Sequence, residues 1–111
     1  MHKHLTAVTA IFLAMFSGWA HAQGAFPNKP LRIVSAGAGS VSDIVSRLLA
    51  QAITGPLGKP VIMDNRPAGD GVATAVSQAA PDGYTVLFSG NALWLRPLLV
   101  KTPYDPVRDF Q

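Results

Sequence analysis

The stretch Leu31-Arg32-Ile33-Val34-Ser35, followed by Ala36-Gly37-Ala38-Gly39-Ser40 and then by residues 41–53, decides the fold. Residues 31–35 are short, apolar and β-branched, as a buried parallel strand would be. From residue 41 onward, apolar residues recur at the spacing of one helix face: Val41, Ile44, Val45, Leu48, Leu49, Ala52 and Ile53. The stretch therefore predicts a strand, a glycine turn and a helix with one apolar face.

The turn predicts an anion site, and we expect the anion to be a carboxylate. Its small residues let the backbone approach a guest closely. Free N–H groups and the positive end of the helix dipole converge at such a turn. The candidate ligand residues are Gly39, Ser40, Val41, Ser42 and Asp43. Ser40 or Ser42 can add a hydroxyl donor. Helix capping is the alternative for Ser42 and Asp43, and it is the expected main role of Asp43.

Composition narrows the class of protein. With 111 residues, of which 49% are hydrophobic, the chain is long enough for one small domain with a core. It has no Cys, which excludes a disulfide framework and a thiolate metal site. The basic residues are scattered along the chain, and this disfavours both nucleic-acid binding and a basic membrane-surface helix.

Residues 1–22 have the pattern of a secretory signal peptide. A short basic start precedes the apolar run Leu5–Phe16, and Ala20-His21-Ala22 matches the cleavage pattern. An N-terminal membrane anchor is the alternative, but the run is short for a bilayer span. Cleavage makes Gln23 the first residue and removes all three histidines. Histidine-dependent nucleophilic catalysis and histidine zinc sites are then excluded from residues 23–111, so we expect no catalytic residue and no metal.

The remaining chain alternates between strand and helix patterns. After the helix, residues 54–58 predict a stop, and the later expected elements are a strand at 60–65, a helix at 72–80, a strand at 84–89, a short helix at 90–99 and an extended segment at 101–111. This β-α-β-α-β-α order predicts an α/β fold with a parallel sheet.

Ligands of open parallel sheets bind beyond the carboxyl ends of the strands. Three loops are expected there: Ser35–Ser42, Asn65–Gly71 and Ser89–Asn91. Ser89, Gly90 and Asn91 are further ligand candidates, or they cap the last helix. For the middle loop, the alternative is a strand-end turn fixed by Pro67.

Several motifs occur together in order. They are Phe26–Val34, Gly39–Asp43, Gly58–Pro67 with its Asn65-Arg66-Pro67, Ala79–Leu87 with its Ala80-Pro81-Asp82-Gly83-Tyr84, and Thr102–Phe110 with its Pro103-Tyr104-Asp105-Pro106-Val107-Arg108-Asp109-Phe110. On these motifs the chain resembles the substrate-binding receptors of tripartite tricarboxylate transporters, also called Bug receptors. The resemblance implies a periplasmic-binding-protein-like (type II) fold of two lobes that close on a ligand. Residues 23–111 look like the N-terminal part of its first lobe, and the second lobe is absent.

The resemblance also implies a function. Such a receptor is not an enzyme and needs no cofactor. It captures a small carboxylate (a di- or tricarboxylate, an amino acid or an aromatic acid) in the periplasm and delivers it to the membrane components of a transporter. Two departures from the family's sequence pattern concern the ligand. Ser40 and Asp70 each stand at a position where the family commonly has a glycine. An acid at the latter position is expected to repel an anion.

Two other classes of protein remain as alternatives. Gly37, Gly39 and Ser42 nearly make the dinucleotide-binding fingerprint, and Asp64 near the end of the second strand can hold a ribose. This favours a Rossmann-like enzyme fragment, although the third glycine is missing and a secreted protein meets little NAD. A structural or adhesive secreted domain is the other alternative, but it leaves three small-residue loops on one side unexplained.

Overall fold

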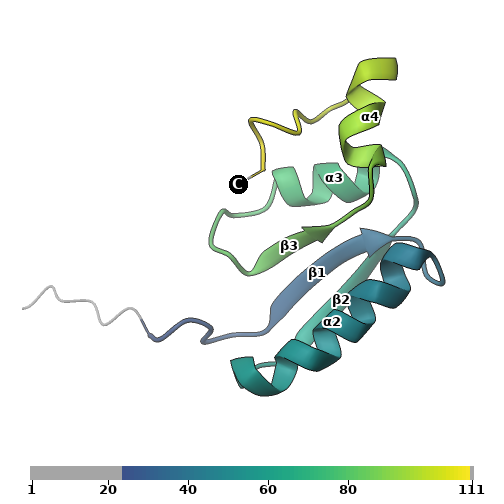
Figure 1. Cartoon of the computed structure of the whole chain (residues 1–111). Coiled ribbons are helices and arrows are strands. Elements are labelled where there is room, and N and C mark those ends of the chain that lie inside the picture. Colours follow the sequence, from purple (N-terminus) through teal and green to yellow (C-terminus); the bar gives the residue numbers. More distant parts are fainter. Residues whose placement is uncertain (1–23, 111) are drawn as a thin grey trace, which may run out of the picture.

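A computed structural model of the chain describes residues 24–110 (Figure 1). Its elements are β1 (Leu31–Ala36), α2 (Val41–Leu57), β2 (Val61–Arg66), α3 (Asp70–Ser77), β3 (Thr85–Phe88) and α4 (Ala92–Leu99). The predicted alternation of strands and helices is confirmed. The predicted signal peptide lies outside the described residues. None of the helices within residues 24–110 is long and apolar enough to cross a membrane.

The sheet has the strand order β2-β1-β3, and both pairings are parallel. The core is centred on β1, in which Leu31, Ile33, Val34 and Ser35 are all buried, and Val72 and Ala73 of α3 add to it. Helix α2 lies over β1 and β2 on one face, and α3 lies on the other face (Figure 1). Since all three strands are parallel, the three predicted loops leave the sheet at the same edge, its carboxyl edge.

The apolar face of α2 does not lie on the sheet. The buried residues of the helix are Asp43, Ser46 and Ala50. The residues of the predicted apolar stripe are instead exposed over much of their surface, with Val41 at 78% and Leu48 at 61%. An amphipathic helix normally turns its apolar side to the core. Here small residues allow close approach to β1, and the large side chains point away from the sheet.

Helix α2 also runs farther than the sequence predicts. The helix passes through Gly55 and Pro56 and ends at Leu57, at the far end of the stop predicted at residues 54–58. Pro56 has no N–H, so the last turn of the helix lacks one backbone hydrogen bond. The helix ends because Gly58 adopts φ 63° and donates its N–H to the carbonyl oxygens of Thr54 and Gly55.

The other boundaries shift by smaller amounts. Helix α3 begins two residues before the predicted start at residue 72, directly after Gly69 with its φ of 119°, and ends three before residue 80. Helix α4 matches its prediction closely. The segment after it is not simply extended, because Asp105 accepts the N–H groups of Val107 and Arg108 in a turn. Trp94 of α4 is 54% exposed.

The turn before β3 ties the start of the described chain to the sheet. Gly83 adopts φ 78°, and Asp82 accepts the N–H of Tyr84 at 3.0 Å. The Tyr84 hydroxyl accepts the N–H of Asn28 at 2.8 Å. Lys29 forms an ion pair with Asp82 at 3.1 Å. The residues between Ala80 and Tyr84 therefore fix how the chain enters β3, and their role is structural.

Candidate functional site

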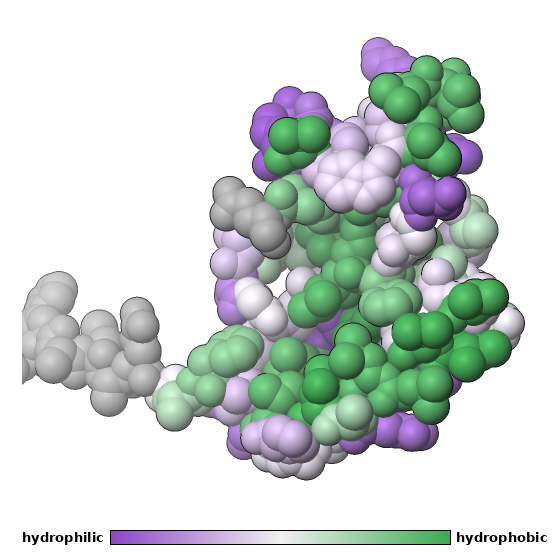
Figure 2. All heavy atoms as spheres, viewed as in Figure 1, coloured by the Kyte–Doolittle hydropathy of each residue, from purple (hydrophilic) through white to green (hydrophobic). Residues whose placement is uncertain are grey.

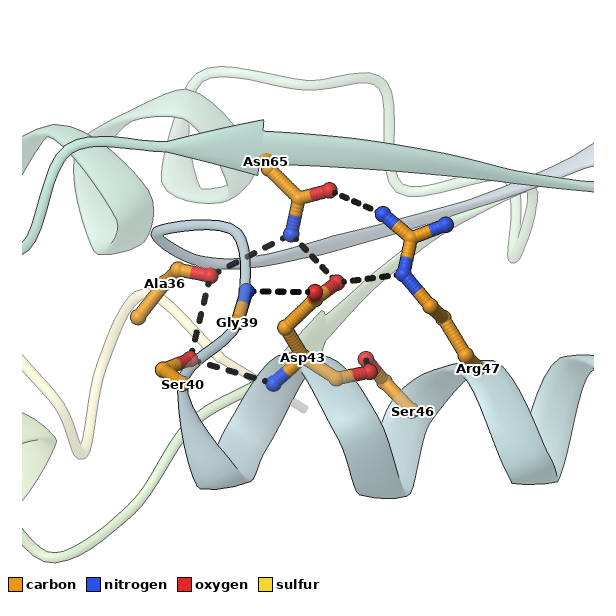
Figure 3. A network of polar contacts seen from close by, with 7 residues as sticks. All are labelled: Ala36, Gly39, Ser40, Asp43, Ser46, Arg47 and Asn65. Atoms are coloured by element: carbon orange, nitrogen blue, oxygen red, sulfur yellow. Dashed lines mark hydrogen bonds and ion pairs between the residues drawn. The ribbon is translucent and has the colours of Figure 1, made fainter.

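The start of α2 is fixed by a reciprocal pair of side chains (Figure 3). Ser40 is the N-cap, and its Oγ accepts the N–H of Asp43 at 3.2 Å. In return, Asp43 Oδ2 accepts the N–H of Gly39 at 2.9 Å. This arrangement is close to a capping box. In that motif the side chain of the cap residue accepts the N–H of the third helical residue, and the side chain of the third residue accepts the N–H of the cap residue. The capping role expected of Asp43 is confirmed, whereas the cap itself is Ser40 and not Ser42.

The second oxygen of Asp43 links the turn to the neighbouring strand. Asp43 Oδ1 accepts Arg47 Nε at 2.9 Å and Asn65 Nδ2 at 2.7 Å. Asn65 also donates to the carbonyl oxygen of Ala36 at 3.2 Å and accepts Arg47 Nη2 at 2.8 Å. Asp43 and Asn65 together therefore join the ends of β1 and β2 to the first turns of α2, and Asp43 is 3% exposed.

The network keeps Asp43 ionised. The N–H of Gly39, and then the hydrogen bonds from Arg47 and Asn65, lower the pKa of Asp43 below its ordinary value. Arg47 lies one helical turn after Asp43, so its guanidinium balances the charge locally. The negative charge of Asp43 is thus directed into the protein, toward its donors.

The network decides which donors of the turn remain for a ligand. The predicted free N–H of Gly39 is not free, because Asp43 accepts it. Among the hydrogen bonds within residues 24–110, the N–H groups of Val41 and Ser42 have no acceptor, and the Ser42 hydroxyl has no partner either. Both N–H groups stand at the positive end of a 17-residue helix. These three donors define the candidate anion site.

The other predicted ligand residues follow β3 at the same edge of the sheet. Asn91 is the N-cap of α4, but its side chain makes no capping hydrogen bond; its carbonyl oxygen accepts the N–H groups of Trp94 and Leu95. Ser89 and Gly90 are exposed and connect β3 to this cap. The structure therefore places Ser89, Gly90 and Asn91 at the same edge as the start of α2.

Asp70 is neutralised by a residue from another element. Arg96 of α4 contacts both carboxylate oxygens, at 2.8 Å and 3.1 Å. The hydrogen bond from Arg96 lowers the pKa of Asp70. The expected repulsion of an anion by Asp70 is therefore offset, since the acid carries its own counter-charge. The pair also ties α4 to the start of α3.

Asp64 is also paired with arginine side chains. Arg66 contacts its carboxylate at 3.0 Å and 3.1 Å, and Arg32 approaches at 3.5 Å. A ribose would have to compete with these arginines, so the site gives the dinucleotide alternative little support. The part of the chain that the structure describes contains no cluster of three or more His, Cys, Asp or Glu side chains suited to a metal ion.

Two residues of this edge were missed by sequence reasoning, Arg47 and Arg96, and the contacts of Asn65 were not predicted. The i,i+4 spacing of Asp43 and Arg47 was the available signal for the first. Asn65 opens one of the three loops predicted at this edge, but its contacts could not be predicted because its partners lie 22 and 29 residues away in the chain. Nothing local in the sequence marks Arg96 as the partner of Asp70.

The parallel β2-β1-β3 sheet with its helices corresponds to part of the first lobe of a periplasmic binding protein, because solved structures of that class share this fold. A structure of the periplasmic binding protein BugD superimposes with a TM-score of 0.70 at 32% identity, covering 77% of this chain and 30% of that one. A structure of a periplasmic transporter gives a TM-score of 0.61 at 31% identity, covering 76% and 30%.

The chain belongs to the tripartite tricarboxylate transporter receptor family, whose model, described as "Tripartite tricarboxylate transporter family receptor", matches residues 45–111. A UPF0065 protein of Bordetella bronchiseptica is 43% identical over 106 residues, covering 91% of this chain and 31% of the relative. Protein BugT of Bordetella pertussis is 34% identical over 113 residues, covering 95% and 34%. The chain thus spans about a third of the length of these relatives.

The lowered pKa of Asp43 gives the first test. The Gly39 amide resonance should titrate with the Asp43 carboxylate, and its midpoint should lie below the ordinary aspartate value of about 3.9. Above the ordinary pKa the bond to the ionised carboxylate contributes fully to stability. That contribution is lost as the pH falls through the lowered pKa. A midpoint at or above the ordinary value, measured by NMR, would show that the network does not form.

Proposed function

We propose that this chain is the N-terminal part of the first lobe of an extracytoplasmic receptor that captures a small carboxylate. The ligand would be a di- or tricarboxylate, an amino acid or an aromatic acid. The receptor would deliver it to the membrane components of a tripartite tricarboxylate-type transporter. Export would use residues 1–22 as a signal peptide cleaved after Ala22, and residues 23–111 would form the lobe.

One observation carries the proposal: within residues 24–110 the donors of Val41 and Ser42 have no acceptor, while the neighbouring Gly39, Ser40 and Asp43 are hydrogen-bonded to one another. A carboxylate needs a few converging donors more than a charged side chain, because the helix dipole adds about 0.3–2 kcal/mol. Asp43, the acid nearest to these donors, is already neutralised by Arg47. Family membership supports the proposal, since it assigns the chain to receptors of a transporter.

A chimera provides the test. In it, residues 24–111 replace the matched part of the Bordetella bronchiseptica relative, so that a complete receptor is measured. Titration calorimetry against a panel of di- and tricarboxylates, amino acids and aromatic acids should find at least one ligand. NAD should not bind. Binding of NAD, or of no carboxylate while the chimera is folded, would refute the proposed function.

Two serine variants separate ligand binding from capping. Ser42→Ala in the chimera should weaken carboxylate binding by roughly 0.5–1.5 kcal/mol. It should leave the thermal midpoint unchanged, because the Ser42 hydroxyl has no hydrogen-bond partner within residues 24–110. Ser40→Ala removes the N-cap and should lower stability by about 1 kcal/mol. Calorimetry and thermal melts on the same samples measure both. Loss of stability without loss of affinity in Ser42→Ala would assign Ser42 to the fold.

A further inference from the structure

Helix α4 has no buried residue with which to anchor itself on the rest of the described chain. Its large apolar residues lie at the surface, and Leu98 and Leu99 are 79% and 80% exposed. Figure 2 shows hydrophobic atoms at the surface over the far end of this helix. A helix that buries no side chain is held only weakly by apolar packing. The position of α4 within residues 24–110 therefore depends on hydrogen bonds and on charge.

Two polar contacts link α4 to other segments of residues 24–110. Arg96 donates from Nε and Nη2 to the two carboxylate oxygens of Asp70, at 2.8 Å and 3.1 Å. The second contact follows from Pro97, which has no N–H and so leaves the carbonyl oxygen of Leu93 without its helical donor. The hydroxyl of the buried Tyr104 donates to this oxygen at 3.2 Å. The helix is thus tied to the start of α3 and to the segment that follows α4.

The ion pair between Asp70 and Arg96 connects two of the loops at the carboxyl edge of the sheet. Asp70 stands near the end of the loop after β2 and is the first residue of α3. Arg96 belongs to the helix that begins directly after the loop Ser89–Asn91. The hydrogen bond between the two side chains lowers the pKa of Asp70 and raises that of Arg96, so both groups stay charged. A bidentate pair of this kind fixes orientation as well as distance.

The loop Ser89–Asn91 has one end fixed by the sheet and the other end fixed by α4. At its start, Phe88 is paired with Ser35 of β1, just before the turn that leads into α2. At its end, Asn91 is the N-cap residue of α4, and its carbonyl oxygen accepts two N–H groups of the helix. The Asn91 side chain makes no capping hydrogen bond, so its amide is a candidate donor to a ligand. A displacement of α4 would therefore displace this amide.

We propose that the pair of Asp70 and Arg96 sets the position of the loop Ser89–Asn91, and that Arg96 is thereby a positioning residue of the carboxylate site. The part that concerns the ligand rests on the proposed function. The Arg96 and Asp70 side chains are 40% and 31% exposed, so the pair adds little to stability. Its effect is to orient α4, and with α4 the loop, toward the edge at which α2 begins.

A double variant of the chimera removes the pair without changing the net charge. For Asp70→Asn combined with Arg96→Met, charge alone predicts the affinity of the parent, because one acid and one base are lost together. Loss of the loop position predicts carboxylate binding that is weaker by roughly three- to tenfold in titration calorimetry. The melting temperature should fall by less than about 2 °C, since both side chains are partly exposed. Arg96→Lys keeps the charge and a donor, and should lose less affinity than the double variant.

Lys29→Met combined with Asp82→Asn is the matched control. It removes an ion pair of 3.1 Å at the opposite edge of the sheet and should bind the carboxylate like the parent. A second readout needs no ligand. In the ¹⁵N-labelled chimera, the heteronuclear NOE values of Gly90 and Asn91 should fall in the double variant that lacks the Asp70–Arg96 pair, because the loop gains mobility. The same values should not change in the control.

Two results would overturn the proposal. One is a folded double variant that binds its carboxylate as tightly as the control, whatever its melting temperature, because the pair would then serve the fold alone. The other is a double variant in which the NOE values of Gly90 and Asn91 equal those of the parent. A folded parent chimera that binds no carboxylate would refute the proposed function by itself. The NOE values would then still decide whether the pair holds the loop.

Discussion

Replacing Gly39 by valine should weaken carboxylate binding in the chimera by roughly 10- to 100-fold. Gly39 adopts φ +82°, a conformation that a β-branched residue resists. No other atom lies within 4 Å of the position that a Cβ would take, so crowding is not the reason. The variant should relieve its strain by moving the turn. That movement breaks the bond from the Gly39 N–H to Asp43 and displaces the donors of Val41 and Ser42.

The same turn provides a matched control. Gly37 has no positive φ, and its added Cβ would also meet nothing within 4 Å. Gly37→Val therefore adds the same side chain without the same strain and should bind within a few-fold of the parent. Titration calorimetry on both variants, with circular dichroism to confirm folding, measures the difference. Equal affinities for the two folded variants would mean that the conformation at Gly39 does not matter for binding.

The second large effect is expected at Asp43. In Asp43→Asn, an amide NH₂ replaces one of the two oxygens that accept from Gly39, Arg47 and Asn65, so at least one donor faces another donor. The turn should lose its fixed shape, and carboxylate affinity should fall by roughly tenfold or more. Charge alone predicts the opposite sign, because removing an acid near an anion site favours the anion. Weaker binding therefore identifies Asp43 as a positioning residue.

Asp82→Asn is the control for this substitution. It makes the same acid-to-amide change in a residue that is paired with Lys29 near the start of β3, at the opposite edge of the sheet. Its affinity for the carboxylate should match that of the parent. If Asp43→Asn binds as tightly as Asp82→Asn, or more tightly than the parent, the network does not position the site.

The order of elements could be predicted because the local signals are strong. The apolar run at residues 31–35 and the glycine turns mark the strand ends, and strictly alternating strands and helices leave a parallel sheet as the solution. The side of α2 that faces the sheet could not be predicted in the same way. Periodicity reveals an apolar stripe, but it does not say whether the stripe meets this sheet or a further layer.

The sequence predicts where the candidate site lies, but it does not predict the hydrogen bonds between the side chains of the site. Strand, small-residue turn and helix predict anion donors at residues 39–43, and that placement stays a prediction. Which N–H groups stay free depends on Asp43, and the side chain of Asp43 is placed by Asn65, 22 residues away. Likewise, the effect of Asp70 depends on Arg96, 26 residues away. Pairs of residues that lie so far apart in the chain produce no periodic pattern in a single sequence.

The most direct measurement follows the amide resonances of Val41 and Ser42 in the ¹⁵N-labelled chimera as the best-binding carboxylate is added. We expect these two amides to shift most, with a downfield proton change typical of new hydrogen bonds. The Gly39 amide should move little, because Asp43 already holds it. Unchanged Val41 and Ser42 resonances in a chimera saturated with carboxylate would contradict the proposed site, because the ligand would then lie elsewhere.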